Sequence, residues 1–261
     1  TDGSTWLRIL PTSIAILVEK MFVAYGFQDE IQVFDLDGNY LWKFGSSGTQ
    51  AGEFNTPHRL SAINNELFVA DSKNHRIQVF DIDGNFLRQF GTYSDSIVIL
   101  SPADVETRNK SSSPIDVHAY DSQIFVADSI KASILVFDLD GKFMKEFEVN
   151  QNVSDISEPY GVFVYDNLIF VSDAEDFSVK VFDLDGNFLK QFGTYGDSIG
   201  QLSIPIDVHA YDNQIFVADL ARTSILVFDL NGKFMSEFEV RQNISDISEP
   251  YGVFVYDNLI F

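Results

Sequence analysis

Short apolar segments alternate with turn-forming residues along the whole chain. In the unit that begins at Pro57, the apolar segments are Arg59–Ile63, Leu67–Asp71, Arg76–Asp81 and Phe86–Phe90, and Gly, Asn, Asp or Pro stands between them. Short segments rich in β-branched and aromatic side chains are typical of β-strands. No segment of this unit has the period of an amphipathic helix. The pattern therefore predicts an all-β unit of four short strands.

This unit repeats along the chain. The motif "VFDLDGN" at Val33–Asn39 returns with small changes. Its Phe recurs at Phe34, Phe80, Phe137, Phe182 and Phe228. The spacing is about 45 residues, with one longer gap of about 57, and such a period is typical of repeat architectures. Four antiparallel strands in a unit of this length predict a blade of a β-propeller.

The character of individual strands supports this interpretation. Third strands such as Ser133–Asp138, "SILVFD", are apolar on both faces, as a blade packed between two others requires. Fourth strands such as Phe188–Phe192, "FLKQF", carry Lys, Arg or Gln in the middle, which suits an outer edge strand.

Five complete units and the beginning of a sixth can be counted. The predicted blades cover about residues 11–45, 57–91, 114–148, 159–193 and 205–239, with a partial blade at 250–261. We therefore expect one domain, 1–261, a six-bladed β-propeller of four-stranded antiparallel blades whose last blade is incomplete, and a natural protein longer than this chain. Residues 1–10 either supply the fourth strand of the last blade or form a loop before Pro11, and we favour the loop.

The repeated "DLDG" motif has two interpretations. Aspartates at alternate positions before Gly38 resemble the start of a calcium loop, which would need further oxygen ligands and a later acidic residue. Instead, a strand begins at once, and the fifth copy has Asn231 in place of the second Asp. Asp-Gly between apolar runs is a strong hairpin signal. We therefore predict tight turns without a bound ion.

The repeat unit resembles a known family. Leu67–Gly91, "LFVADSKNHRIQVFDIDGNFLRQFG", is very similar to the NHL-repeat pattern. The Pro that opens each first strand fits as well: Pro11, Pro57, Pro114, Pro159, Pro205 and Pro250. The resemblance covers nearly the whole chain and implies a propeller that typically has six blades. It does not select an activity, because the family hosts several functions.

A second period lies over the first. Ile115–Asp128 returns as Ile206–Asp219, an offset of about 91 residues or two blades, which indicates tandem duplication of a blade pair. The differences between the copies cluster in one loop, Ser129–Ala132 against Leu220–Thr223. Drift in a surface loop explains them, and tuning of a contact surface is the alternative.

Polar side chains are expected at the central channel, which the first strands line. Residues two and four positions after the opening Pro share one strand face. Asp116 and His118 occupy these positions in one blade, Asp207 and His209 in another, and Arg59 stands at the first of them in the second blade. The set could bind a divalent cation, calcium or zinc, or a small polar ligand. Alternatively, the side chains only form hydrogen bonds between blades, with Arg59 neutralising an Asp.

Charge and composition exclude several classes of function. The formal net charge is −22, from 39 acidic and 17 basic residues, so binding to nucleic acid or to anionic lipid is not expected. The absence of Cys removes disulfides and zinc–thiolate sites. No apolar run is long enough to insert into a membrane.

The leading functional hypothesis is a non-enzymatic binding or scaffold propeller. Its upper face consists of the loops before each first strand and the loops between second and third strands. These loops and the channel mouth would bind a protein or a small polar ligand. The alternative is a metal-dependent hydrolase or lyase acting at the channel.

The enzyme alternative rests on two further resemblances. Propeller lyases that resemble NHL proteins hold zinc through three histidines, but here only His75 matches and its counterparts are Ala132, Phe177 and Thr223. Lactonase-type propellers place Glu, Asn and Asp around calcium, and Asp116 and Asp207 are a partial match.

Two loop features complete the expectations. Glycosylation-type triplets begin at Asn109, Asn152 and Asn243 and fit a secreted or cell-surface protein. The long loop Gly91–Pro114 is either a tolerated insertion or a lid.

Overall fold

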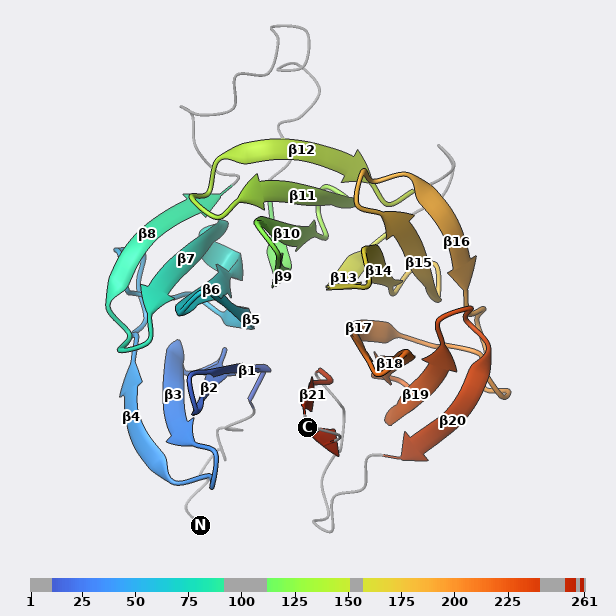
Figure 1. Ribbon diagram of the computed structural model, residues 1–261, viewed down its shortest axis with the longest axis horizontal. Helices are drawn as coiled ribbons and strands as arrows, with labels where there is room; N and C mark the ends of the chain where they lie inside the picture. Colours follow the sequence, from blue (N-terminus) through green and yellow to red (C-terminus); the bar gives the residue numbers. More distant parts are fainter. Residues whose placement is uncertain (1–10, 92–111, 151–156, 240–251, 257–258, 261) are drawn as a thin grey trace, which may run out of the picture.

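The computed structural model describes residues 11–91, 112–150, 157–239, 252–256 and 259–260. Its strands form a ring of blades around a central axis (Figure 1). Five blades are four-stranded antiparallel sheets with their strands in sequence order, the first at the axis and the fourth at the rim. The predicted all-β propeller is therefore confirmed. Residues 1–10, most of the long loop after Gly91 and the triplets at Asn109, Asn152 and Asn243 lie outside the described residues.

The blades share one plan of strands. The first strands are β1 (Ser13–Leu17), β5 (Pro57–Ile63), β9 (Pro114–Tyr120), β13 (Pro159–Tyr165) and β17 (Pro205–Tyr211). The second strands are β2 (Lys20–Tyr25), β6 (Glu66–Asp71), β10 (Gln123–Asp128), β14 (Leu168–Asp173) and β18 (Gln214–Asp219). The third strands are β3 (Glu30–Asp35), β7 (Arg76–Asp81), β11 (Ser133–Asp138), β15 (Ser178–Asp183) and β19 (Ser224–Asp229). The fourth strands are β4 (Tyr40–Phe44), β8 (Phe86–Gly91), β12 (Phe143–Glu148), β16 (Phe188–Phe192) and β20 (Phe234–Glu239).

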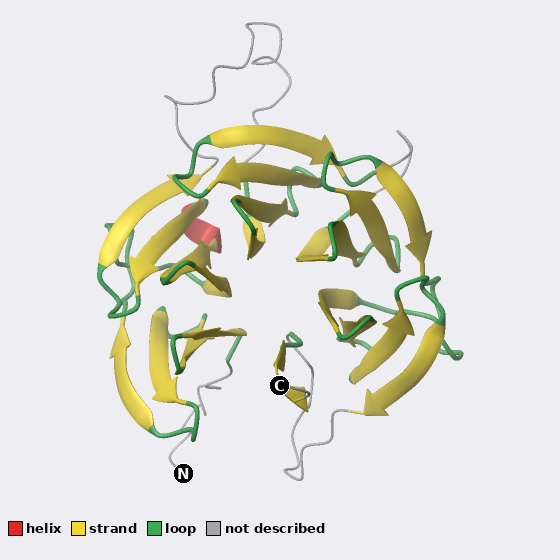
Figure 2. Ribbon diagram, in the orientation of Figure 1, coloured by secondary structure: helices red, strands yellow, loops and turns green. Residues whose placement is uncertain are grey.

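Two smaller features complete the ring. A hairpin of β21 (Val255–Tyr256) and β22 (Leu259–Ile260) stands between the first and fifth blades, next to β17 (Figure 1). A single turn of 3-10 helix, η1 (Ser72–Asn74), joins β6 to β7 and is the red element of Figure 2. Within the described ranges, no helix has the length and apolar character needed to cross a membrane.

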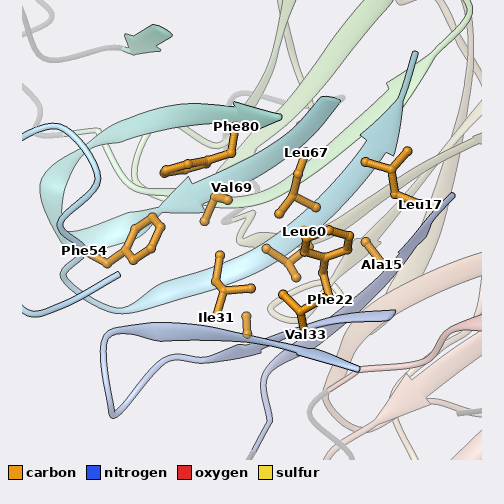
Figure 3. Packing of buried hydrophobic residues seen from close by; sticks show 11 residues of the cluster. Ala15, Leu17, Phe22, Ile31, Val33, Phe54, Leu60, Leu67, Val69 and Phe80 are labelled. Carbon is orange, nitrogen blue, oxygen red and sulfur yellow. The ribbon is translucent and has the colours of Figure 1, made fainter. Parts of the chain in front are cut away.

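The hydrophobic core lies between adjacent blades. In the cluster of Figure 3, Phe22 and Ile31 of the first blade pack against Leu67 and Phe80 of the second, and Phe54 joins them from the connecting loop. Each of these side chains is almost fully buried. Burial of one such side chain contributes about 1.5–3 kcal/mol. The strands are apolar on both faces because each blade packs against two neighbours.

The "DLDG" segments form tight turns, as predicted. Oδ1 of Asp35 accepts the backbone N–H groups of Asp37 at 3.1 Å and Asn39 at 2.8 Å, and Gly38 takes a left-handed φ of 84°. The side-chain hydrogen bond from Asn39 is the largest cause that lowers the pKa of Asp35. The first Asp accepts the backbone N–H four residues later in the other copies too, at Asp81, Asp138, Asp183 and Asp229. The turn conformation is thus confirmed, and the absence of a bound ion stays a prediction.

Candidate functional site at the propeller axis

The two channel aspartates join neighbouring blades. Oδ2 of Asp116 accepts the backbone N–H of Val162 in the next blade at 2.7 Å, and its Oδ1 accepts the N–H of Val117 at 2.7 Å. Asp207 repeats the arrangement, since its Oδ2 accepts the N–H of Val253 at 2.8 Å. Both side chains are buried. Each carboxylate therefore ties the inner strand of one blade to that of the next.

Glycines make room for these carboxylates. Gly161 and Gly252 stand two residues after the opening Pro, where the preceding blade has an Asp. A Cβ at Gly161 would lie 3.0 Å from Oδ1 of Asp207, and one at Gly252 would lie 2.6 Å from Nη1 of Arg59. At both positions a side chain would force the neighbouring group to shift. Gly161 and Gly252 therefore leave room for Asp207 and Arg59.

Arg59 spans the axis. It belongs to β5, and its Nη1 donates to the carbonyl oxygen of Thr12 at 2.5 Å. Its Nη2 lies 3.4 Å from Oδ2 of Asp207 on β17 and 3.4 Å from the carbonyl oxygen of Ile206. β5 and β17 lie on opposite sides of the axis (Figure 1). The buried guanidinium therefore occupies the axis at this level and pairs with a carboxylate across it.

The charges at this level are not balanced when both aspartates are ionised. Burial is the largest cause that raises the pKa of Asp116 to about 7, and the negative charge of Asp207 adds to it. Burial also raises the pKa of Asp207, whereas the nearby Arg59 opposes that rise. One guanidinium thus faces two carboxyl groups. The raised pKa of Asp116 favours its neutral form, whereas Asp207 is the carboxylate that pairs with Arg59.

The two channel histidines belong to a stack of aromatic rings. The rings of His118, Phe163 and His209, each from the same position of consecutive blades, lie 4.0 Å apart centre to centre. Phe254 follows His209 at 5.4 Å. Burial lowers the pKa of His118 to about 4 and that of His209 to about 3, so both imidazoles are neutral at physiological pH. Nδ1 of His209 is buried and has no hydrogen-bond partner among the described residues.

All five predicted residues thus lie on inner strands around the axis, but they form two levels. Arg59, Asp116 and Asp207 interact at one level, and Phe163 stands between His118 and His209 at the other. Asp116, Asp207 and Arg59 make the contacts between blades that the packing alternative expects, and ligand binding at the five residues stays a prediction. In the part of the chain that the structure describes, no three His, Asp or Glu side chains are grouped to bind a metal. The lyase-like candidate His75 lies elsewhere, with Nδ1 against the carbonyl oxygen of Ser112.

A second set of buried aspartates was missed by the sequence reasoning. An Asp ends four of the second strands and is completely buried: Asp71, Asp128, Asp173 and Asp219. Each accepts a backbone N–H from the loop before the inner strand of its own blade, as Asp173 does from Glu158 at 3.0 Å. These bonds fix the upper-face loops on the blades. The recurrent "FVAD" or "FVSD" was the available signal, because an acidic residue ending an apolar strand needs a partner.

Comparisons with known proteins agree with this architecture. A family model for the NHL repeat matches residues 54–80, and one described as a 6-bladed beta-propeller matches residues 150–247. The search of curated proteins returned no significant match.

Three solved structures illustrate the likeness. The computationally designed Ika8 protein superposes with a TM-score of 0.59 at 16% identity, over 96% of this chain and 66% of its own, just under two thirds. A chain of the nidogen/laminin complex gives 0.64 at 16% identity, over 88% and 80%. Virginiamycin B lyase from Staphylococcus aureus gives 0.64 at 12% identity, over 93% and 73%. At such identities the likeness concerns the fold alone. The two family-model matches and the described blades support an NHL-repeat β-propeller.

Proposed function

We propose that this protein is a non-enzymatic binding propeller that presents its upper-face loops to a protein partner. One observation carries the proposal: the carboxyl groups at the axis already have partners within the fold. Asp116 and Asp207 each accept backbone N–H groups that join two blades, and Arg59 crosses the axis to Asp207. A channel filled in this way favours recognition by the surrounding loops over a small polar ligand at the channel mouth.

Catalysis at the same residues would require breaking these bonds. A calcium or zinc ion at Asp116 or Asp207 would displace the N–H groups of Val162 or Val253, and each orphaned buried donor costs about 1–3 kcal/mol. Such an ion would also have to compete with Arg59 for Asp207. These costs support binding rather than metal-dependent chemistry.

A metal-dependent hydrolase or lyase is the second candidate, and one observation favours it. Nδ1 of His209 is buried without a hydrogen-bond partner in the described part of the chain, and a neutral imidazole nitrogen is a ready ligand for zinc. His118 is also neutral and lies one ring further along the stack.

Metal analysis of the purified protein tests the proposal. We expect less than one calcium or zinc per chain after dialysis against each ion, and no thermal shift on adding either. The matched variant is His118→Phe with His209→Phe, because Phe stands at the same position in two other blades. One equivalent of metal that the variant loses would overturn the binding proposal in favour of the enzyme.

A further inference from the structure

Two connections between blades have the same conformation up to the last residue, where Thr56 has a left-handed φ of 61° and Ile204 does not. Loop 45–56 joins β4 to β5, and loop 193–204 joins β16 to β17. The first loop has an isolated parallel β-bridge between Ser47 and Phe54, and the second has one between Tyr195 and Leu202. The backbone hydrogen bonds also repeat, from Gly48 to Phe54 at 2.9 Å and from Gly196 to Leu202 at 3.1 Å. Phe54 and Leu202 are fully buried, so both loops are anchored alike.

The exposed side chains of the two loops differ. Where the first loop has Ser47, Ala51 and Thr56, the second has Tyr195, Ile199 and Ile204. Tyr195 is 69% exposed and Ile199 is 82% exposed. The first loop demonstrates that polar or small residues support this conformation. The large apolar side chains of the second loop are therefore not needed for folding.

We use the name apolar loop surface for the large apolar side chains of this loop and of the loop beside it: Phe177, Tyr195, Ile199 and Ile204. The ring of Phe177 lies 4.7 Å from that of Tyr195, and Phe177 comes from the neighbouring loop between β14 and β15. Exposed apolar side chains gathered on one loop are typical of a binding surface.

The loop that carries this surface is held in place. Nη1 of Arg222 donates to the carbonyl oxygens of Gly196 at 3.2 Å and Ser198 at 3.4 Å. The same guanidinium forms an ion pair with Glu237 at 3.0 Å. At the end of the loop, the backbone N–H of Ser203 donates to Asp219 at 2.6 Å. A loop fixed before binding loses little conformational entropy on binding, which raises affinity.

Acidic residues accompany the apolar side chains along both loops. Asp197 is exposed between Tyr195 and Ile199, and Glu175 is exposed two residues before Phe177. Burial is the largest cause that raises the pKa of Glu158 on the adjacent loop, and the negative charge of Glu175 raises it further. A second copy of this chain would bring the same charges and a net charge of −22. Electrostatic complementarity instead favours a partner with basic residues around its apolar side chains.

We infer that the apolar loop surface binds a protein segment whose apolar side chains are bordered by Lys or Arg. The inference rests on the proposed binding function and assigns it a surface and a class of partner. The apolar side chains of the segment would cover Tyr195 and Ile199, and its basic residues would pair with Asp197 and Glu175.

A display library of short random peptides, selected on the whole chain, tests the inference. The variant carries Tyr195→Ser, Ile199→Ala and Ile204→Thr, the residues of the matched loop, so it should fold with an unchanged circular dichroism spectrum. We expect enriched peptides with apolar residues and net positive charge, whose affinity falls about tenfold or more for the variant. Leu189→Ser is the control, because Leu189 is 50% exposed on β16 of the same blade and should not matter.

Each other outcome would overturn the inference. Enriched peptides that bind the variant equally would move binding to another surface, while the proposed function would stand. A selection that enriches no peptide dependent on this loop also rejects it. If sedimentation shows a dimer that the variant abolishes, the occupant is a second copy of the chain. Stoichiometric metal, by contrast, bears on the proposed function and leaves this surface untouched.

Discussion

Aspartates at the axis and aspartates in the outer turns have opposite environments. Asp116 is buried, and its burial and the charge of Asp207 raise its pKa to about 7. Asp35 lies in an exposed turn, where hydrogen bonds from Asn39 lower its pKa. Both residues accept backbone N–H groups, yet only the axial one links two blades. Position in the ring, rather than residue type, thus decides whether an acidic side chain maintains the assembly of the propeller.

The largest effect is expected when the positive charge of Arg59, which pairs with an axial carboxylate, is removed. Arg59→Met leaves Asp207 buried without its ion pair, and loss of one partner of a buried pair costs about 3–5 kcal/mol. Lys43→Met is the control, because the side chain of Lys43 in the Lys43–Glu30 pair is 54% exposed and such a pair contributes about 1 kcal/mol or less. Urea unfolding measures both. Equal losses for the two variants would show that the axial pair has no special role.

The second test concerns the stacked histidines. The pKa values of His118 and His209 in the fold, about 4 and 3, lie below the ordinary value of 6.5. The unfolded chain therefore binds protons first as the pH falls, and stability present above pH 6.5 is lost toward pH 4. We expect roughly 2 kcal/mol of loss per histidine by about pH 4.5.

His118→Phe with His209→Phe should remove this loss and flatten the unfolding free energy between pH 6.5 and 4. His58, whose pKa burial lowers to about 4, remains in the variant and accounts for a residual slope. If the variant keeps the full acid sensitivity of the wild type, the histidines are not buried as described.

A third test compares the two kinds of aspartate by the sign of their pH dependence. Because the pKa of Asp116 is raised, its stabilising contribution is complete below about pH 4 and is lost as the pH rises through 7. Because the pKa of Asp35 is lowered, its contribution is present above its ordinary pKa and is lost on acidification. Asp116→Asn and Asp35→Asn should therefore change the slope of unfolding free energy against pH in opposite directions.

Asp116→Asn should also cost about 1–3 kcal/mol, because an amide cannot accept both N–H groups that the carboxylate accepts. Slopes that change in the same direction would contradict the raised pKa of Asp116. Chemical denaturation at a series of pH values gives both quantities.

The sequence predicted those features that depend on local pattern. The repeat spacing predicted the strands, and the Asp-Gly pairs predicted the turns. Strand alternation predicted that Asp116 and His118 lie on one face of their strand, toward the axis. The contact of Arg59 with Asp207 could not be predicted, because it crosses the ring between blades far apart in sequence. The hydrogen bond from Val162 to Asp116 likewise depends on how neighbouring blades close together.

The smallest effect is expected at the second aspartate of the turns. Asp37 and Asp83 are exposed, and each uses only its backbone N–H in the turn, donating to the first Asp at 3.1 and 2.9 Å. The fifth copy already has Asn231 there, and its N–H makes the same bond at 2.8 Å. The double variant Asp37→Asn, Asp83→Asn should therefore change the free energy of unfolding by less than about 0.5 kcal/mol. This figure includes the loss of the exposed Lys20–Asp83 ion pair.

The thermal shift on adding calcium should be the same in this double variant and in the wild type. If calcium stabilises only the wild type, these turns bind the ion. The exposed aspartates would then have a role of their own, as the buried ones do in joining the blades.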